Sequence, residues 1–269
     1  MEFKRVAIVT RYGSKLARDI ANIVAELLIA RNSRVYTIKP LSLYNSIVLD
    51  EGDKLMENDI DLIIAIGGDG TTLRAIRWVD GDIPVFSIRI KGSRGVLADV
   101  NTDSIHESIE IIYSNKFYID ERMRIYAISD EKSSIAAVNE IMITKSSMNF
   151  TPIYEIEIDE HIIRSKMDGL ILATATGSSG YSYSFGGPIL HEKSNDLIMT
   201  PIASLNRLPT IIIPDCSINV RTDSECAIFV DGQHIFNTTK PIIVRRYHKN
   251  ARFLRIRKRG LTHLEKLGY

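Results

Sequence analysis

The chain has 269 residues, of which 45% are hydrophobic and 25% are charged, and its 34 basic side chains are balanced by 33 acidic ones. This length suffices to bury the core of one large domain or two modest ones. The balanced charge argues against binding to nucleic acid or to an acidic membrane surface. No apolar run approaches the ~20 residues needed to cross a bilayer, and the chain begins with an expected strand, so we expect a cytoplasmic protein.

Residues that commonly build metal sites or disulfides form no recognisable pattern. Cys216 and Cys226 are the two cysteines, and they do not form a CxxC motif. We therefore expect reduced, half-buried thiols. The six histidines form neither an HxH nor an HExxH pair, so no metal site built from histidine is expected and no metal ligand is assigned.

Up to about residue 100, the hydrophobic pattern alternates between short strands and helices. The expected strands are Val6–Val9, Val35–Ile38, Leu62–Ile66 and Pro84–Ile88, and the expected helices are Lys15–Arg31, Thr72–Val79 and, just beyond, Asp103–Ser114. Strands that are apolar on both faces are typical of a parallel sheet covered by helices on both sides. Residues 1–100 are therefore predicted to form an α/β nucleotide-binding domain with a Rossmann-like sheet.

The remaining chain reads almost entirely as strands. The expected strands are Arg122–Ser129, Ile135–Thr144, Tyr154–Ile158, Ile162–Arg164, Leu170–Thr174, Thr210–Ile213 and Ala227–Val230. Alternation of apolar and polar residues, clearest in Tyr154–Ile158, predicts an antiparallel all-β domain over residues 101–249. The basic tail, residues 250–269, is expected to form a strand and a short helix and to return to the first domain.

The first motif with chemical potential is Gly67-Gly68-Asp69-Gly70, directly after an expected buried strand and before a helix that opens with Thr71. Ligands of open parallel sheets bind at the carboxyl ends of the strands. Glycines let a phosphate approach the backbone, and the amides at the start of a helix favour anions. An aspartate there can hold Mg²⁺ or accept a proton. The alternative is a tight turn with Asp69 as the helix N-cap. Neither a Walker A loop nor a GxGxxG motif is present.

Two further motifs lie in the expected β domain. Asn139-Glu140 places an amide and a carboxylate inside an apolar strand, where they can hold an adenine edge or ribose hydroxyls; a simple strand end is the alternative. The second motif follows another strand: a run of small hydroxyl residues and glycines, Thr174–Ser182. Such a turn supplies many hydrogen-bond donors with little steric cost, which suits phosphates or ribose.

Together and in this order, the three motifs resemble the NAD kinase family over nearly the whole chain. Asp168-Gly169, Asp231-Gly232-Gln233 and Lys266-Leu267-Gly268-Tyr269 also fit the family's pattern. GGDG alone is shared with diacylglycerol and sphingosine kinases, whereas the combination is much more specific. The resemblance implies Mg²⁺-dependent phosphorylation of the 2′-hydroxyl of the adenosine ribose of NAD to give NADP, with ATP or polyphosphate as donor.

The resemblance also implies roles for individual residues. Asp69 is the expected catalytic base or metal-orienting acid, with Gly67, Gly68, Gly70 and Thr71 around the phosphates. The implied NAD-binding residues are Asp69, Gly70, Arg74, Asn139, Glu140, Lys166, Asp168, Ser179, Gly180, Tyr181, Ser182, Tyr183, Ser184, Ala203 and Gln233. The chain departs from the family at Ala175, at Ser179-Gly180 and at Ser87–Gly92, where Arg89 stands in place of an asparagine.

Two other functions remain open at this point. A lipid kinase of the diacylglycerol type shares GGDG but needs an apolar acceptor pocket, which Asn139-Glu140 argues against. A non-catalytic NAD sensor would keep the binding loops without needing Asp69. We also expect a homodimer or homotetramer whose contacts come from the β domain, because its many half-polar strands leave a sheet face to cover.

Overall fold

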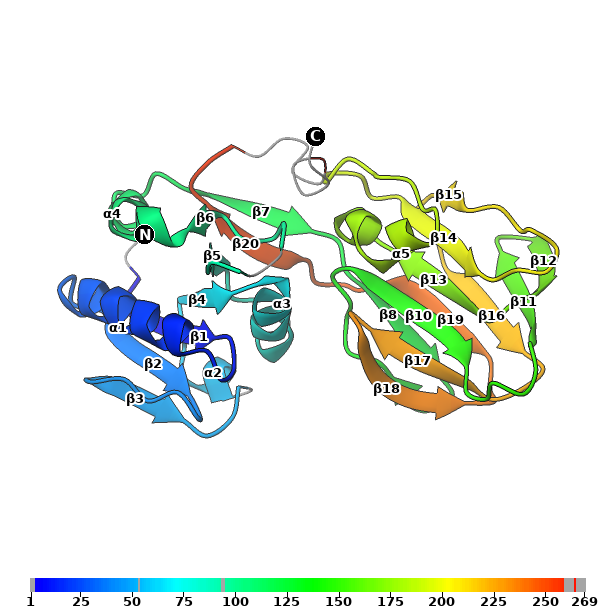
Figure 1. The fold of residues 1–269 in the computed structure, drawn as a ribbon, viewed down its shortest axis with the longest axis horizontal. Helices are drawn as coiled ribbons and strands as arrows, with labels where there is room; N and C mark the ends of the chain where they lie inside the picture. The colour runs from blue at the N-terminus through cyan, green and yellow to red at the C-terminus, as the bar shows by residue number, and fades with distance from the viewer. Residues whose placement is uncertain (1–2, 53, 93–94, 259–263, 265–269) are drawn as a thin grey trace. The chain divides into compact units, whose positions relative to one another are not determined.

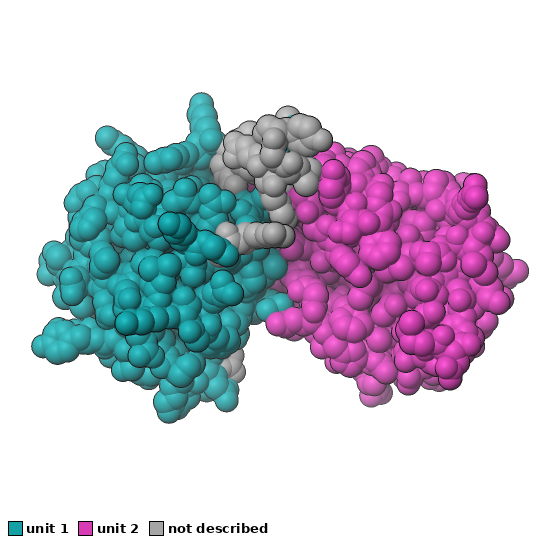
Figure 2. Space-filling model, in the orientation of Figure 1, with its two compact units in different colours: residues 1–121, 251–269 teal, residues 122–250 magenta. Residues whose placement is uncertain are grey.

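The computed structural model describes residues 3–52, 54–92, 95–258 and 264. The chain divides into two compact units, Met1–Glu121 with Ala251–Tyr269 (unit 1) and Arg122–Asn250 (unit 2), coloured separately in Figure 2. The α/β domain was expected to end near residue 100, whereas unit 1 continues through the next helix and strand to Glu121. Apart from residue 264, the expected C-terminal helix lies outside the described residues.

Unit 1 is built on one mainly parallel sheet (Figure 1). Its strands, in spatial order, are β3 (Ser46–Leu49), β2 (Arg34–Ile38), β1 (Arg5–Thr10), β4 (Leu62–Gly67), β5 (Val85–Arg89), β20 (Ala251–Arg255) and β7 (Tyr118–Arg122), and β6 (Val100–Asn101) also pairs with β5. The pairs from β3 to β20 are parallel. Through β20 the chain re-enters the sheet after unit 2 is complete.

Helices of unit 1 connect these strands. They are α1 (Lys15–Ile29), α2 (Lys54–Glu57), α3 (Asp69–Trp78) and α4 (Ile105–Tyr113), with the 3-10 turn η1 (Thr102–Ser104) before α4. The side chain of Ser14 accepts a hydrogen bond from the amide of Ala17 at 3.2 Å and so caps the start of α1. Every residue of β4 is buried, which explains its unbroken apolar sequence.

Unit 2 contains two antiparallel sheets. The first has the order β15 (Ile211–Ile213), β14 (Leu197–Ile202), β13 (Gly169–Ala173), β10 (Glu140–Lys145), β17 (Cys226–Val230) and β18 (Gln233–Thr238). The second has the order β12 (His161–Lys166), β11 (Ile153–Ile158), β16 (Ile218–Thr222), β19 (Ile242–Arg246), β8 (Ile125–Ser129) and β9 (Lys132–Ser133).

The two sheets of unit 2 share one hydrophobic core. Ile141 and Leu172 of the first sheet and Ile156 and Val244 of the second are fully buried within the same cluster. Side chains therefore alternate along each strand between this core and the opposite face of the sheet, as in a β-sandwich. The α/β unit with a mainly parallel sheet and the antiparallel all-β unit confirm the predicted fold class.

On its other face, the first sheet is covered by the segment that follows β13. This segment contains the 3-10 turn η2 (Thr176–Ser179) and the short helix α5 (Tyr181–Ser184). Ala175 and Leu190 pack against Ile171, Ala173 and Ile198 in a small second core. Among the residues that the structure describes, no helix is both long and apolar enough to cross a membrane.

Candidate functional site

The GGDG turn joins the carboxyl end of β4 to the start of α3. β4 ends at Gly67, and α3 begins at Asp69 with Gly68 in the N-cap position and no side-chain capping bond. The alternative interpretation of Asp69 as the helix N-cap is therefore wrong, because Asp69 lies one residue inside the helix. A Cβ on Gly67 would come 2.3 Å from Oγ1 of Thr71, so only glycine lets the strand turn this closely.

The carboxylate of Asp69 instead holds a neighbouring loop. Its Oδ2 accepts the amide hydrogen of Val96 at 3.0 Å, and its Oδ1 accepts that of Leu97 at 2.9 Å. A Cβ on Gly95 would come 2.1 Å from Oδ1, so the glycine leaves room for the carboxylate. Each carboxylate oxygen has further lone pairs, and Asp69 is only half-buried. It therefore keeps acceptor capacity on the side that faces solvent.

A cavity of about 540 Å³ opens in front of this turn. It is lined by Arg11, Tyr12, Gly68, Asp69, Gly70, Thr71, Arg74 and Gly92. The four predicted phosphate-binding residues are thus at or beside one cavity wall, and Gly67 lies buried just behind it. Cationic side chains and the start of a ten-residue helix on its wall favour an anionic ligand.

Arg74 is the half-buried cation of this cavity. Its guanidinium lies 3.8 Å from the centre of the Tyr12 ring and 5.2 Å from that of Trp78, and one terminal nitrogen donates to the carbonyl of Thr10 at 2.7 Å. Its Nε is buried and has no hydrogen-bond partner among the residues that the structure describes. Burial lowers the pKa of Arg74 from its usual value, yet arginine stays protonated. A charge that has no acidic partner among the described residues fits an anion from outside the chain.

Asn139 and Glu140 mark a second group of polar residues, in unit 2. Asp231, in the turn between β17 and β18, accepts the amide hydrogens of Val138, Asn139 and Glu140 at 3.1, 2.8 and 3.3 Å. The backbone bends at 138–139, and β10 begins only at Glu140. The prediction of a continuous strand over Ile135–Thr144 was therefore wrong, because Asp231 takes the amides that a strand neighbour would otherwise bind.

The loop after β13 folds against this bend. The amide of Thr174 donates to the carbonyl of Asn139 at 2.8 Å, and its hydroxyl donates to the carbonyl of Val138 at 2.6 Å. A Cβ on Gly177 would come 2.2 Å from the oxygen of Asn139, and one on Gly180 would come 2.9 Å from Oε2 of Glu140. The two glycines thus let the loop approach the Asn139-Glu140 pair closely. The structure brings these two motifs together within unit 2.

The residues from Ser179 to Ser184 differ in exposure. Ser179 and Ser182 are buried, whereas Tyr181, Tyr183 and Ser184 are exposed and Gly180 is intermediate. The hydroxyl of Ser182 is 2.8 Å from that of Thr200, so it fastens α5 to β14. Gln233, the first residue of β18, is exposed and pairs with Val230 beside Asp231.

Three other predicted residues form a separate group at the opposite end of β13. Oδ1 of Asp168 accepts from Nζ of Lys145 at 2.6 Å and from the hydroxyl of Thr151 at 3.2 Å. The amide of Asp168 donates to the carbonyl of Ile202, the residue before Ala203. The carbonyl of the exposed Lys166 accepts the amide hydrogen of Leu205. Asp168 and Thr174 flank the two ends of β13 and are therefore roughly 20 Å apart, at ~3.4 Å per residue. Because Thr174 is the residue that contacts Asn139, unit 2 does not bring the Asp168 group to Asn139 and Glu140.

Sequence reasoning assigned no role to several residues that the structure places at these sites. Asp231 had a visible signal, since an Asp-Gly pair between two strands is a typical hairpin turn. Arg11 and Tyr12 follow β1 and come close to α3 only when the chain is folded, so no local sequence pattern indicated them. Within the described residues, no three His, Cys, Asp or Glu side chains form a group that could hold a metal ion.

The chain is similar to known proteins over nearly its whole length. Residues 6–117 match the model of the ATP-NAD kinase N-terminal domain, and residues 138–256 match that of the ATP-NAD kinase C-terminal domain. An NAD kinase from Thermococcus sibiricus is 31% identical over 266 residues, which cover 95% of each chain. An NAD kinase from Bacteroides fragilis is 39% identical over 184 residues, covering 65% of this chain and 63% of that protein.

Two solved structures share the fold. The crystal structure of an NAD kinase from Archaeoglobus fulgidus in complex with ATP superposes with a TM-score of 0.81 at 22% identity and covers 98% of both chains. A yeast NADH kinase complexed with NADH gives 0.87 at 20% identity, covering all of this chain and 87% of the yeast chain. Matches of both domain models, together with a relative above 30% identity, establish that the chain belongs to the ATP-NAD kinase family.

Proposed function

We propose that the chain transfers the terminal phosphoryl group of a donor to the 2′-hydroxyl of the adenosine ribose of NAD, giving NADP. The observation that carries the proposal is the position of Asp69, whose carboxylate is fixed by two amides at the entrance of a cavity with cationic walls. Phosphoryl transfer needs positioning and charge neutralisation more than covalent help from the protein. A fixed carboxylate beside phosphate-binding glycines meets that need.

In the proposed reaction, the 2′-oxygen of the ribose forms a bond to the terminal phosphorus. The bond from this phosphorus to the bridging oxygen of the donor breaks, and that oxygen leaves with the electron pair. The hydroxyl proton passes to Asp69, directly or through a water. The guanidinium of Arg74 would neutralise charge on the transferred group, because no carboxylate of the described part of the chain pairs with it.

Mg²⁺ is the metal that we expect with the donor. Magnesium is commonly held by one or two carboxylates together with waters and substrate phosphates. Asp69 fits this arrangement because its carboxylate keeps acceptor capacity in a half-exposed turn. The ion would supply charge neutralisation on the phosphates, and Asp69 would orient it.

NAD would contact the group around Asn139 and Glu140. Asp231 and Thr174 fix the backbone there, which would hold the half-buried Asn139 in a defined position for a ligand. The glycines at 177 and 180 let the loop after β13 pack closely against this pair. Lys166, Asp168 and Ala203 remain predicted NAD contacts on the family resemblance alone.

Assembly into a homodimer or homotetramer is proposed on the outer face of the second sheet in unit 2. Ile153, Ile162 and Ile243 expose 47%, 58% and 38% of their surface there. Exposed apolar side chains gathered on one sheet face are typical of a protein interface. On the same sheet, Arg164 and Arg221 each form an ion pair with Glu155, which reduces the cost of covering these charges.

Assays with different acceptors separate the proposal from its alternatives. The purified protein is incubated with ATP and Mg²⁺ and with NAD or dispersed diacylglycerol, and phosphorylation of each acceptor is measured. The proposal expects NADP and no phosphatidic acid. Phosphorylated lipid would support the lipid kinase, and tight NAD binding without turnover under any donor would support the sensor. Either result contradicts the proposal.

A further inference from the structure

A buried arginine lies behind the loop that holds Asp69. Arg255, the last residue of β20, exposes only 1% of its surface. Its Nη1 donates a hydrogen bond to the carbonyl of Leu97 at 2.6 Å, and the amide of Leu97 in turn donates to Oδ1 of Asp69 at 2.9 Å. Leu97 thus connects the guanidinium to the carboxylate that we propose as the proton acceptor.

Two carboxylates fix this guanidinium. Oδ2 of Asp120, in β7, accepts from Nε of Arg255 at 3.3 Å, and Oδ1 of Asp99 lies 3.7 Å from Nη1. The side chains of Asp99 and Asp120 are 1% and 9% exposed, so both carboxylates are buried beside the cation. The guanidinium carbon also lies 4.6 Å from the centre of the Phe253 ring. A planar group held on several sides directs its remaining donors at fixed points.

The loop itself is fastened to two strands of the sheet. The amide of Asp99 donates to the carbonyl of Ser87 in β5 at 2.9 Å, and Oδ2 of Asp99 accepts the amide hydrogen of Ile256 at 3.1 Å. Residues 95–99 are thus attached to β5 and to the end of β20, which are neighbours in the sheet (Figure 1). The loop amides that hold Asp69 therefore depend on a strand that enters the sheet only after unit 2 is complete.

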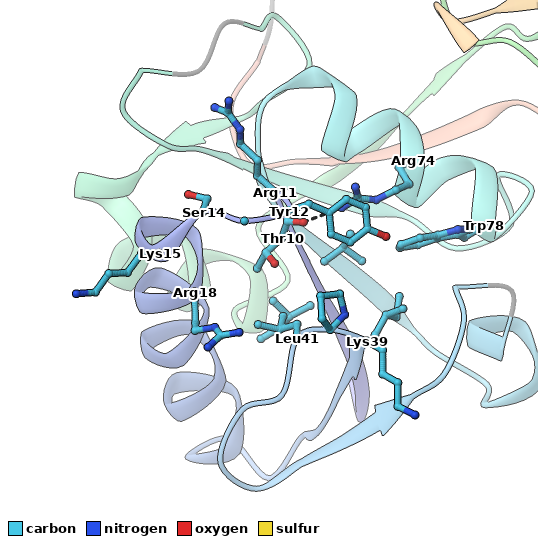
Figure 3. A pocket seen from close by; sticks show the side chains of 15 residues that line it. Thr10, Arg11, Tyr12, Ser14, Lys15, Arg18, Lys39, Leu41, Arg74 and Trp78 are labelled. Atoms are coloured by element: carbon cyan, nitrogen blue, oxygen red, sulfur yellow. Dashed lines mark hydrogen bonds between the residues drawn. The ribbon is translucent and has the colours of Figure 1, made fainter. Parts of the chain in front are cut away.

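The helix that carries Asp69 is attached to the sheet without Arg255. A buried pair of hydroxyls joins α3 to β5 at 2.9 Å. Further along α3, Arg74 donates to the carbonyl of Thr10 and lies over the ring of Tyr12 (Figure 3). Weakening the contacts of Arg255 should therefore leave α3 in place and loosen chiefly the amides that hold the carboxylate.

We infer that Arg255 is a positioning residue for phosphoryl transfer, which fixes Leu97 and, through its amide, the carboxylate of Asp69. This rests on the proposed function and adds to it the group that sets the position of the base. Arg255 is buried and is not among the described residues that line the GGDG cavity, so it acts through the loop and not on a substrate. A displacement of about 1 Å at a reacting group can cost ~10² in rate.

Two matched variants on β20 test this role. Arg255→Lys keeps a positive charge beside the two carboxylates but loses the planar fork that also reaches Leu97. Arg252→Lys is the control, because Arg252 is only half-buried and donates to the carbonyl of Asp82, before the amino end of β5, at 2.9 Å. Arg255→Lys should lower kcat by roughly 10–100-fold and leave the KM for NAD and for the donor within a few-fold. Arg252→Lys should change none of these.

Hydrogen exchange measures the loop independently of activity. It is followed by mass spectrometry in the peptide that contains the amides of Val96 and Leu97. Exchange there should be faster by roughly tenfold or more in Arg255→Lys, because a hydrogen bond from a charged group is lost, and unchanged in Arg252→Lys. Asp120→Ala removes one carboxylate partner and leaves Arg255 in place. It should change exchange and kcat in the same direction, and it replaces Arg255→Lys in every comparison if that variant does not fold.

A double-mutant cycle separates positioning from a purely structural role. In a protein that already carries Asp69→Asn, Arg255→Lys should lower kcat little further, because the carboxylate that it positions is gone. The same loss of kcat in both backgrounds would show that Arg255 acts on something other than Asp69, and would overturn the inference.

The outcomes distinguish this inference from the proposed function. Wild-type protein that forms no NADP would refute the proposed function, while faster exchange in Arg255→Lys would still support the connection to Asp69. NADP formation with wild-type kcat and exchange in folded Arg255→Lys would overturn the inference alone. Equal losses of kcat in Arg255→Lys and Arg252→Lys would also overturn it.

Discussion

Replacement of Asp69 by asparagine removes one negative charge from the turn and should abolish most turnover. Loss of a general base typically lowers the rate by ~10²–10⁴. The structure adds a second effect, because Oδ1 and Oδ2 each accept an amide hydrogen, from Leu97 and Val96. An asparagine can satisfy only one of them and turns its amino group toward the other donor. Loss of this hydrogen bond should lower the free energy of unfolding by ~1.5–3 kcal/mol. This corresponds to a decrease in Tm of roughly 3–12 °C.

Both effects are measured with Asp69→Asn and a matched variant, Asp231→Asn. Asp231 also braces backbone amides, those of Asn139 and its neighbours, but lies in unit 2 and has no proposed part in proton transfer. Both variants should lose comparable stability in thermal unfolding. Only Asp69→Asn should lose kcat by ~10²–10⁴ with NAD affinity within a few-fold, whereas Asp231→Asn should mainly raise the KM for NAD. If a folded Asp69→Asn variant keeps wild-type kcat, the role of Asp69 is limited to holding the loop.

The remaining predictions concern NAD, assembly and the thiols. Asn139→Ala should raise the KM for NAD by roughly tenfold, since a lost polar contact costs ~1–3 kcal/mol, and a rise in the donor KM instead would show that the pockets are assigned the wrong way round. Light scattering at micromolar concentration should give the mass of two or four chains; a fully active single chain would refute the assembly. Burial raises the pKa of Cys216 and of the more buried Cys226, which lowers the thiolate fraction at neutral pH. A thiol reagent should therefore modify Cys216 slowly and Cys226 more slowly still, and equal fast reaction would contradict the described burial.

The strands β1, β2, β4 and β5 of unit 1 and the GGDG turn were predictable because their signals are local, whereas β3, β6 and β7 were not predicted. β4 is buried along its whole length, so every residue is apolar, and the turn that follows it needs glycine where Thr71 comes close. By contrast, β18 was missed. It is an edge strand of its sheet, and only Thr238, at its end, is buried, so no apolar alternation marks it.

What the sequence could not predict arises from contacts between distant segments. Arg74 lies over Tyr12 because α3 packs beside the end of β1, and neither residue carries a signal of that contact. Asn139 leaves the strand because Asp231, far along the chain, takes its amide. The separation of Asp168 from Asn139 follows from the antiparallel pairing of β10 with β13, which sets Glu140 against Ala173 and Thr144 against Gly169.

Transfer of labelled phosphate tests the central claim most directly. The protein is incubated with NAD, Mg²⁺ and ATP labelled in the γ-phosphate, and the products are separated and checked by an NADP-specific dehydrogenase. The account predicts one label per NADP formed, at the 2′-position, and loss of nearly all transfer in Asp69→Asn. Label that stays in ATP or inorganic phosphate while the folded protein binds NAD would contradict it.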